Sequence, residues 1–451
     1  MPSEQDMISK YGGAAPRYTS YPTAPHFHTG VDGEVYRRWL GALCDGEATS
    51  VYLHVPYCRQ LCWYCGCNTR ATQTYHPVAD YVKTLQAEIA LVDRALTAKP
   101  RVTNLHWGGG TPTILSGGDF IDIMRRLRDA FDFAEDADIA IEIDPRTLTE
   151  SKADMLAEAG VTRASLGVQE FSEHVQAAIN RRQSYQLVAK IVGMLRANGI
   201  NALNFDLMYG LPQQTEEDVA RSAALTAELR PNRIAVFGYA HVPWMKSHQQ
   251  LIHDDELPTE SERLRQSAAA AKVFEAAGYV RIGLDHFALP DDSLAQLSRS
   301  GGLRRNFQGY TDDPAEVLIG FGASAIGSFP QGYVQNDSNV RTYAAAVTKG
   351  ALPVARGVEI CLEDILRRAV IERLMCDFTT DLKKICARHD MPASIFEEER
   401  AQLEFFEQDG LVTINDDVIA IPKDRRQYVR SVCAVFDSYL KTGKARHSKA
   451  V

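Results

Sequence analysis

The sequence predicts an α/β protein: an incomplete parallel (β/α)6-type barrel, preceded by an N-terminal arm and followed by a mainly helical C-terminal domain. Two observations predict the barrel. From residue 51 onwards, short apolar runs alternate with longer stretches of helix-spaced apolar residues, and glycine-rich or polar motifs directly follow several of the short runs. Such alternation is typical of parallel strands joined by crossover helices. A change of pattern after residue 355 predicts the C-terminal domain.

Residues 1–50 have no clean hydrophobic period and contain the aromatic-rich stretch Pro16–Thr23, so we expect an extended arm there rather than a folded unit. Six short apolar runs are the expected barrel strands: Val51–Val55, Val102–Trp107, Ile139–Ile143, Ala164–Val168, Ala202–Leu207 and Ile234–Tyr239. Crossover helices are expected between them, including Ala79–Ala98, Gly118–Phe131, Tyr185–Ala197 and Glu216–Leu229. Residues Ala268–Leu284 are compatible with one further unit. The barrel and its extension are therefore expected to span residues 51–355.

The remaining residues, 356–451, predict helices at Leu362–Met375, Ser394–Gln408 and Arg426–Leu440, with a hairpin over Gly410–Ile421. This order is typical of a winged-helix module, a fold that often binds DNA. The helix that would contact DNA has no dense basic stripe, so the pattern favours a lid or packing domain, and no nucleic-acid partner is expected.

The composition limits the classes of function. The 451 residues carry a formal net charge of −9, which argues against general binding to nucleic acid or to a membrane surface, although a local basic pocket remains compatible with an acidic total. The first residues contain no apolar signal core, and no run reaches the roughly 18 apolar residues of a membrane span. We therefore expect a cytoplasmic location.

Four of the nine cysteines lie between Cys58 and Cys67, with the spacing C-x3-C-x2-C-x-C just after the first expected strand. In a reducing compartment, closely spaced cysteines more often bind metal or do redox chemistry than form disulfides. Three cysteines on one loop can hold three irons of a [4Fe–4S] cluster and leave the fourth iron open to a ligand. Zinc is the alternative, but it usually takes four closed ligands, and only His54 or His76 would be available to complete the set.

The other five cysteines are scattered in mostly helical contexts and are each expected to be a small buried hydrophobe: Cys44, Cys361, Cys376, Cys386 and Cys433.

The C-x3-C-x2-C spacing of Cys58, Cys62 and Cys65 resembles the signature of the radical S-adenosylmethionine (SAM) superfamily. The resemblance implies that the open iron chelates the amino and carboxylate groups of SAM, and that an electron from the cluster yields a 5′-deoxyadenosyl radical. With the fourth cysteine, Cys67, the pattern resembles the oxygen-independent coproporphyrinogen III oxidases, in which the last cysteine is needed without ligating the cluster. Packing beside the loop is the alternative role for Cys67.

Further motifs lie where the expected strands end, the place where barrel enzymes gather functional residues. The segment Trp107–Thr113 contains three consecutive glycines, which permit a close approach of backbone to a ligand, a plain tight turn being the alternative. Glu142, between two apolar neighbours, can accept hydrogen bonds from ribose hydroxyls. The segments Pro16–Thr23 and Arg305–Tyr310 also resemble the same oxidases. Those enzymes often have His where this chain has Arg304, which leaves the role of that position open.

The resemblance implies two SAM molecules. The cluster-bound SAM is expected to contact Tyr52, Gly109, Glu142 and Ile326. The second SAM is expected to contact Tyr64, Gly110, Thr111, Gln169, Arg181, Asp206 and Ala240. The apolar Ile326 and Ala240 rest on the resemblance alone and would otherwise be interpreted as core.

The resemblance also implies the reaction: oxidative decarboxylation of two propionates of coproporphyrinogen III to vinyl groups, giving protoporphyrinogen IX in haem biosynthesis. The four carboxylates of that substrate would need a local basic pocket, for which Arg17 and Arg305 are candidates, surface solvation being the alternative. Further implied are an electron donor such as flavodoxin or ferredoxin, a final electron acceptor that the sequence does not identify, no membrane partner, and a monomer.

Two other functions share part of this pattern. A haem-carrying chaperone shares the barrel and three cysteines, but such proteins generally lack the fourth cysteine and the Pro16–Thr23 stretch, both of which are present here. A radical methyltransferase acting on haem uses a similar chemistry, and the Arg305–Tyr310 segment favours the oxidase over it.

Overall fold

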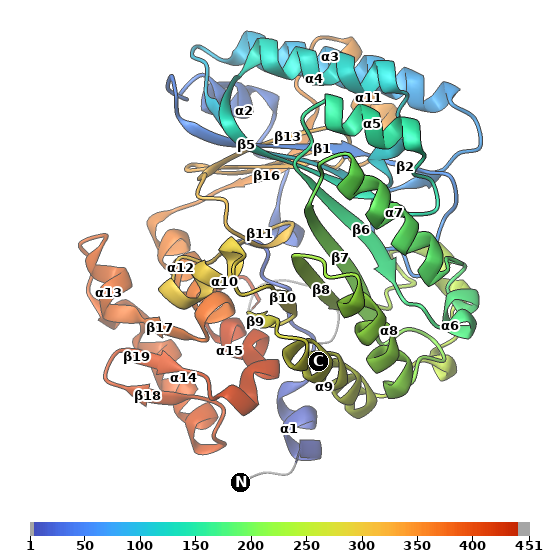
Figure 1. The fold of residues 1–451 in the computed structure, drawn as a ribbon. Coiled ribbons are helices and arrows are strands. Elements are labelled where there is room, and N and C mark those ends of the chain that lie inside the picture. The colour runs from blue at the N-terminus through green and yellow to red at the C-terminus, as the bar shows by residue number, and fades with distance from the viewer. Residues whose placement is uncertain (1–3, 441–451) are drawn as a thin grey trace.

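A twelve-stranded sheet organises the protein, for which the computed structural model describes residues 4–440 (Figure 1). Six consecutive neighbours in this sheet are parallel and form the barrel wall: β1 (Ala48–Val55), β4 (Arg101–Gly109), β5 (Asp132–Ile143), β6 (Arg163–Gln169), β7 (Ala202–Tyr209) and β8 (Arg233–Gly238). These are the six expected strands; five have slightly different ends, and β5 begins well before the expected Ile139, at Asp132. The predicted incomplete parallel barrel is confirmed.

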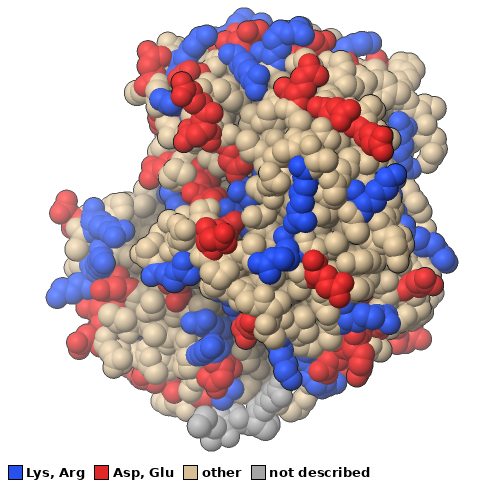
Figure 2. Space-filling model, viewed as in Figure 1, with Lys and Arg blue, Asp and Glu red and all other residues tan. Residues whose placement is uncertain are grey.

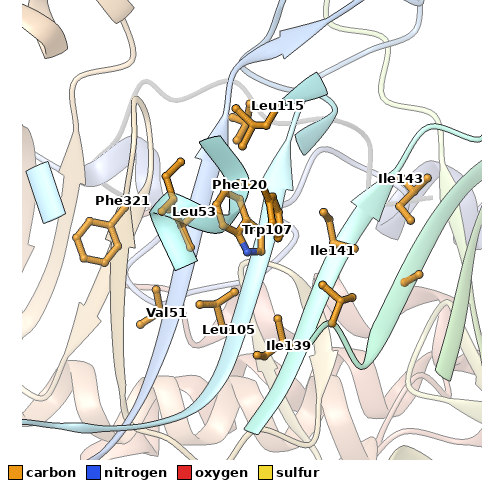
Figure 3. Close-up of a cluster of buried hydrophobic side chains, with 14 of the residues drawn as sticks. Val51, Leu53, Leu105, Trp107, Leu115, Phe120, Ile139, Ile141, Ile143 and Phe321 are labelled. Atoms are coloured by element: carbon orange, nitrogen blue, oxygen red, sulfur yellow. The ribbon is translucent and has the colours of Figure 1, made fainter. Parts of the chain in front are cut away.

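Helices cover the outside of this wall (Figure 1). Those that follow the barrel strands are α3 (His76–Ala95), α4 (Gly117–Ala130), α5 (Glu150–Glu158), α6 (Glu173–Ala178), α7 (Tyr185–Ala197), α8 (Glu216–Glu228) and α9 (Glu260–Ala276). Their apolar faces pack on outward-pointing strand residues; the Trp107 ring, for example, stacks on Phe120 of α4 with centroids 4.5 Å apart (Figure 3).

The alternation of a strand places neighbouring side chains on opposite faces. Leu53, Trp107 and Ile141 point outwards into the buried core (Figure 3). The residues between them, such as Tyr52 and Glu142, therefore point into the barrel. The same alternation that buries the apolar side chains in the outer core therefore directs the polar side chains into the barrel.

The sheet continues beyond the barrel with strands that the sequence analysis did not identify. On one side β1 pairs in parallel with β13 (Val317–Phe321), which is followed by antiparallel β14 (Ile326–Phe329), β15 (Gly332–Asn336) and β16 (Val354–Glu359). On the other side β8 pairs antiparallel with β10 (His286–Ala288), and β10 with β9 (Val280–Ile282). Outside this sheet, β11 (Arg304–Asn306) and β12 (Gly309–Thr311) form a hairpin, and α10 (Ser293–Ser300) and α11 (Val340–Thr348) complete this part.

The N-terminal arm contains two helices that the expectation of an extended arm missed: α1 (Glu4–Tyr11) and α2 (Gly33–Leu40). Each has only eight residues, too few for a clear helical period. Asp32 caps α2 by accepting hydrogen bonds from two backbone N–H groups of its first turn. Tyr18 and Tyr21, between the helices, are buried in the core of the C-terminal part.

The C-terminal part has its own hydrophobic core and lies beside the barrel (Figure 1). Its elements are α12 (Leu362–Asp377), β17 (Thr379–Asp381), α13 (Leu382–Ala387), α14 (Glu397–Gln408), β18 (Thr413–Asn415), β19 (Val418–Ala420) and α15 (Val429–Val435). The predicted hairpin is confirmed as β18–β19. The last helix is shorter than expected: it begins at Val429, after a 3-10 turn, and ends at Val435. Residues 441–451 of the predicted domain lie outside the described residues.

Acidic and basic side chains are interspersed over the face shown in Figure 2. Within residues 4–440, no helix combines the length and the apolar character needed to cross a membrane. The scattered cysteines follow the expectation only in part: Cys376, Cys386 and Cys433 are buried, whereas Cys44 and Cys361 are exposed, because they lie in a loop and at a helix start.

Candidate active site

The clustered cysteines lie on a loop that leaves the carboxyl end of β1. Parallel pairing of β2 (Tyr57–Cys58) with β3 (Arg70–Ala71) closes this cysteine loop at its base. Its middle is tied to the segment after α6, because the Asn180 amide donates to the Leu61 carbonyl at 3.1 Å. The loop is therefore fixed at the barrel mouth, where the sequence placed it.

Hydrogen-bond donors surround the sulfur atoms. The Thr111 hydroxyl donates to the Cys58 Sγ at 3.3 Å. Arg146 Nη2 and Arg181 Nη1 each lie 3.5 Å from the Cys62 Sγ. Cationic donors favour the thiolate over the thiol, and the thiolate is the form that binds metal.

Cys65 and Cys67 form a pair with opposite proton affinities. The hydrogen bond from the Cys67 thiol, helped by Lys246 and Arg181, lowers the pKa of Cys65 to about 7, against the effect of burial. The same pairing and the charge of Cys65 raise the pKa of Cys67 well above its usual value, and the Glu142 charge adds to it, although Cys67 is solvent-exposed. Cys67 thus keeps its proton while Cys65 readily becomes a thiolate.

A second loop, residues 246–251, makes hydrogen bonds to the backbone of the cysteine loop. Its 3-10 turn, Ser247–Leu251, brings the His248 Nε2 to 2.7 Å from the Cys65 carbonyl, and Lys246 Nζ donates to the Cys67 carbonyl at 2.9 Å. The backbone of the last two clustered cysteines is therefore held independently of any ligand.

The donor set fits an iron–sulfur cluster. Three thiols on one short loop, each near a hydrogen-bond donor, are the ligands that such clusters take. Within residues 4–440, no three His, Cys, Asp or Glu side chains lie close enough to ligate one metal ion. The charges of Cys65 and Cys62 contribute to the raised pKa of the Cys58 thiol, so the three sulfur atoms lie within electrostatic range of one another.

The glycine run Gly108–Gly110, at the end of β4, packs tightly against neighbouring residues. A Cβ on Gly109, whose φ is +113°, would lie 2.9 Å from the His54 ring, and one on Gly108 would lie 2.9 Å from Glu142 Oε1. A Cβ on Gly110 would lie 2.6 Å from the Tyr57 carbonyl. The run is therefore more than a plain tight turn, because its glycines let β4 approach the cysteine loop and the inward side chains of β1 and β5.

Four inward side chains of β1, β4 and β5 form a group of two hydrogen-bonded pairs that are joined by ring stacking. His54 Nε2 lies 2.8 Å from the Asn68 carbonyl, which can only accept, so Nε2 carries the proton and Nδ1 accepts from the Tyr52 hydroxyl at 3.0 Å. Burial lowers the pKa of His54 and favours this neutral form. The Tyr52 ring stacks on His106, whose Nε2 lies 3.3 Å from Glu142 Oε1.

The other Glu142 oxygen accepts from the backbone. Gly109 N donates to Oε2 at 3.1 Å, so both carboxylate oxygens are held by residues of β4. Glu142 also lines the barrel cavity. Tyr52, Gly109 and Glu142, three of the four residues expected around the cluster-bound SAM, are thus brought together.

Ile326, the fourth residue of that set, lies apart from this hydrogen-bonded group. It begins β14, and its carbonyl lies against Gly320, whose register partner on β1 is Tyr52. Its side chain packs near the Phe27 and Tyr333 cluster. The position is adjacent in the sheet, but no contact in the described residues assigns it a role.

Asp206 is the inward carboxyl of β7. Its Oδ2 accepts from the Ser165 hydroxyl at 3.3 Å. Burial, assisted by the nearby Glu142 charge, raises the pKa of Asp206 to about 7. Near neutrality this carboxyl therefore exists in both forms and can donate or accept a hydrogen bond.

Arg181 links the cysteine loop to β5 and β6. It is buried, pairs with Asp144 at 3.4 Å and donates to the Gly167 carbonyl. The same Asp144 holds Arg146 through an ion pair of 2.6 Å. Arg181 Nε is buried without a partner in the described residues, so one donor remains for a ligand. Gln169, at the end of β6, has a left-handed φ of +67°, which turns the chain where β6 leaves the sheet.

Tyr64 and Ala240 are joined through a residue that the sequence did not single out. Gln249 Nε2 donates to the Tyr64 carbonyl at 2.9 Å and to the Ala240 carbonyl at 3.3 Å. The Tyr64 ring packs with Tyr239 and Leu211. Of the residues expected around the second SAM, Tyr64 and Ala240 thus share a partner, whereas Gly110 and Thr111 follow β4 on the other side of β5 and β6.

Arg17 and Arg305 come together beyond the end of β8. Arg17 Nη2 donates to the Gly238 carbonyl at 3.0 Å, and Arg305 Nη2 donates to the Arg17 carbonyl at 3.2 Å. The Arg305 guanidinium lies 4.5 Å from the Tyr310 ring centroid, and its Nε and Nη1 are buried without partners in the described residues. The two candidate counter-charges therefore share one place in the fold.

The barrel interior is hollow. A cavity of about 200 Å³ is lined by inward residues of the barrel strands, among them His106, Glu142 and Asp206, and by His286. His286 Nδ1 lies 2.7 Å from Asp285, whose pKa falls to about 2 because this hydrogen bond and the Arg305 and Arg17 charges outweigh burial. An ionised Asp285 carboxylate therefore lies beside His286, which lines the cavity.

Sequence reasoning missed several partners of the site: His54, Asp144, Arg146, Lys246, His248 and Gln249. A signal existed for two of them. His54 stands two residues after Tyr52 on the same strand face, and Asp144 stands two residues after Glu142. Arg146 follows Asp144 by two residues without a pattern of its own, and Lys246, His248 and Gln249 come from a distant segment, so no local pattern indicates them.

Comparison with known proteins agrees with this geometry. Residues 52–226 match the model of the radical SAM superfamily. The chain is 48% identical over 447 residues, 99% of both chains, to the oxygen-independent coproporphyrinogen III oxidase of Bradyrhizobium diazoefficiens, and 38% identical to that of Escherichia coli, covering 98% of this chain and 96% of the other. The solved structure of the E. coli coproporphyrinogen III oxidase, described as a radical SAM enzyme, superposes with a TM-score of 0.90 at 35% identity and covers 97% of this chain and 99% of the other.

Proposed function

The chain belongs to the oxygen-independent coproporphyrinogen III oxidase family of radical SAM enzymes, and from that membership we propose how its residues divide the reaction. It is an oxidoreductase of haem biosynthesis that uses a [4Fe–4S] cluster and SAM. The observation that carries this conclusion is the 48% identity to such an oxidase over 99% of the chain, combined with the cysteine loop at the barrel mouth. Its substrate is coproporphyrinogen III, of which two propionates are oxidatively decarboxylated to vinyl groups to give protoporphyrinogen IX.

We propose that Cys58, Cys62 and Cys65 hold the cluster. When bound, the cluster and SAM supply the one-electron chemistry that removes hydrogen from the substrate. Thr111 and Arg146 stabilise the thiolates of Cys58 and Cys62 through their hydrogen bonds. Cys67 keeps its proton beside Cys65 and is assigned a role after cluster assembly rather than that of a ligand.

We propose two SAM sites on the two groups of inward residues. Tyr52, Gly109, Glu142 and Ile326 orient the cluster-bound SAM. Tyr64, Gly110, Thr111, Gln169, Arg181, Asp206 and Ala240 orient the second. The Glu142 oxygens, already aligned by β4, suit ribose hydroxyls, and the unpartnered Arg181 Nε suits an anionic group. Arg17 and Arg305 are proposed to meet substrate carboxylates.

The electron donor, the location, the oligomeric state and the division into domains are proposals as well. We propose that an electron carrier such as flavodoxin or ferredoxin reduces the cluster and that the protein acts as a cytoplasmic monomer; its free cysteines suit a reducing compartment. The final electron acceptor is unassigned. We further propose three functional units, residues 1–50, 51–355 and 356–451, with the last acting as a lid or packing domain.

Genetic complementation tests the function. The chain should restore haem-independent anaerobic growth to a bacterium that lacks its own coproporphyrinogen III oxidases, and Cys58→Ser should not. Failure of the wild-type protein to support growth, although it is expressed with a loaded cluster, would contradict the assignment. Tight haem binding in that case would favour the chaperone.

A further inference from the structure

Arg263 of α9 occupies a slot that two glycines leave open at the ends of β7 and β8. A Cβ on Gly238 would come within 3.1 Å of Arg263 Nη2, and one on Gly210 would overlap Nη1. The guanidinium carbon lies 5.6 Å from the centroid of the Tyr209 ring. A side chain at Gly210 would require the guanidinium to shift, so the two glycines let Arg263 lie directly against the backbone at this place.

No protein group in the described residues neutralises Arg263 directly. Residues 4–440 contribute neither an ion pair nor a hydrogen bond to its guanidinium, which contacts the Tyr209 ring. Glu260 on the same helix attracts it from farther away. A partly buried guanidinium without a bound acceptor has lost water contacts that an anion would replace.

A second cation shares this slot. Arg17 Nη2 donates to the Gly238 carbonyl at 3.0 Å, so Arg17 and Arg263 approach the same residue. They repel each other: after burial itself, the Arg17 charge is the main influence that lowers the pKa of Arg263. Arg305 lies next to Arg17, and Asp285 supplies one negative charge nearby. The local excess of positive charge favours binding of an anion.

We propose that Arg263 and Arg17 form a clamp that binds a propionate carboxylate of the tetrapyrrole substrate. This inference rests on the proposed function and names the group that recognises the substrate. Two guanidinium groups around one carboxylate can each donate paired hydrogen bonds, the geometry that arginine provides and lysine does not. The clamp lies at the carboxyl ends of β7 and β8, the face of the barrel that also carries the cysteine loop.

Steady-state kinetics of the cluster-loaded enzyme test the clamp. Arg263→Gln should raise KM for coproporphyrinogen III about 10- to 100-fold, the loss expected for charge-assisted hydrogen bonds, with kcat changed by less than about threefold. The KM of Arg263→Lys should lie between those of the wild type and of Arg263→Gln. Arg265→Gln is the matched control, because Arg265 lies on the same helix, is exposed and pairs with Glu216 at 3.7 Å; its KM should be that of the wild type.

Equilibrium binding distinguishes the loss of the Arg263 charge from a change in packing around the substrate. Fluorescence titration with coproporphyrin III should show weaker binding to Arg263→Gln than to the wild type, whereas its tetramethyl ester, which has no carboxylates, should bind both equally. An unchanged KM in Arg263→Gln, or equal losses for acid and ester, would overturn the clamp. A wild-type enzyme that does not decarboxylate coproporphyrinogen III would instead overturn the proposed function, independently of any variant.

Discussion

Cys65 and Cys67 show how two identical side chains, two residues apart, come to differ. The hydrogen bond between them and the positive charges beside Cys65 stabilise one thiolate at the expense of the other. Lys246 and His248 hold both backbones, so the difference is built into the protein. This difference supports our proposal that Cys67 lies close to the cluster ligands without being one of them.

The difference predicts separate effects of two substitutions. After anaerobic reconstitution, Cys67→Ser should retain iron and sulfide close to wild-type levels but lose turnover, whereas Cys58→Ser should lose most of its iron, because it removes a ligand. Iron analysis and the visible absorption of the cluster measure this directly. Equal iron loss in both variants would make Cys67 a ligand.

Asp206 makes stability depend on pH. Because burial raises its pKa to about 7 in the folded protein, above about 3.9 in the unfolded chain, the folded state binds more protons between these values and stability falls as pH rises through this range. Protein without SAM should lose on the order of 2 kcal/mol between pH 5 and 8, after discounting for solvent in the cavity.

Asp206→Asn should remove that part of the pH dependence. Glu88, whose pKa burial also raises to about 7, contributes in the same direction in both proteins, so the difference between wild type and variant isolates Asp206. Thermal unfolding at several pH values measures it. Parallel pH profiles for the two proteins would contradict the assigned shift.

At the scale of single elements, successive side chains of each barrel strand point alternately into the outer core, where they stabilise the fold, and into the barrel, where we propose that they serve the reaction. Ile141 and Glu142 are neighbours on β5, yet Ile141 is fully buried in the outer core (Figure 3), whereas Glu142 lines the cavity. Ile141→Ala should destabilise the protein by about 2–5 kcal/mol. Glu142→Gln keeps the side-chain volume and should change stability by less than about 1 kcal/mol while weakening SAM binding.

Denaturant unfolding together with SAM titration checks both variants. The expected pattern is a large loss of stability in Ile141→Ala, with SAM affinity retained in the fraction that is folded, and the reverse in Glu142→Gln. Normal SAM binding by a stable Glu142→Gln protein would contradict the proposed role of that carboxylate.

The length and spacing of the sequence patterns decide how much of the structure the sequence can predict. The barrel strands are regular apolar runs, and the cysteines are adjacent in sequence, so both were found without the structure. The short strands of the sheet extension and the eight-residue helices α1 and α2 are too brief for a periodic signal. Arg263 and Gln249 act through contacts with distant segments, which no local pattern encodes.

For the whole molecule, the N-terminal arm connects the barrel to the C-terminal part. The arm carries Arg17 to the end of β8, while Arg430 of α15 holds it from the other side by donating to the carbonyls of Ala15 and Pro16. Lys10 forms an ion pair with Asp409 near α14. The position of a proposed substrate-binding residue therefore depends on the C-terminal part.

Arg430→Met tests this dependence. Loss of its hydrogen bonds leaves buried carbonyls unsatisfied and should destabilise the arm by about 1–3 kcal/mol. Residues 12–22 should then exchange amide hydrogen faster and be cut sooner by protease, with the cluster content unchanged. Lys423→Met, at an exposed position before α15, is the control. Unaltered exchange in the arm would show that other contacts position it.

The most direct measurement is anaerobic turnover followed by mass spectrometry of the tetrapyrrole. The reconstituted protein, given SAM, a reductant, coproporphyrinogen III and an electron acceptor, should release a product that has lost two carboxyl groups, and this loss should require both SAM and Cys58. Intact substrate in the presence of a loaded cluster and SAM cleavage would contradict the account and indicate a different tetrapyrrole reaction.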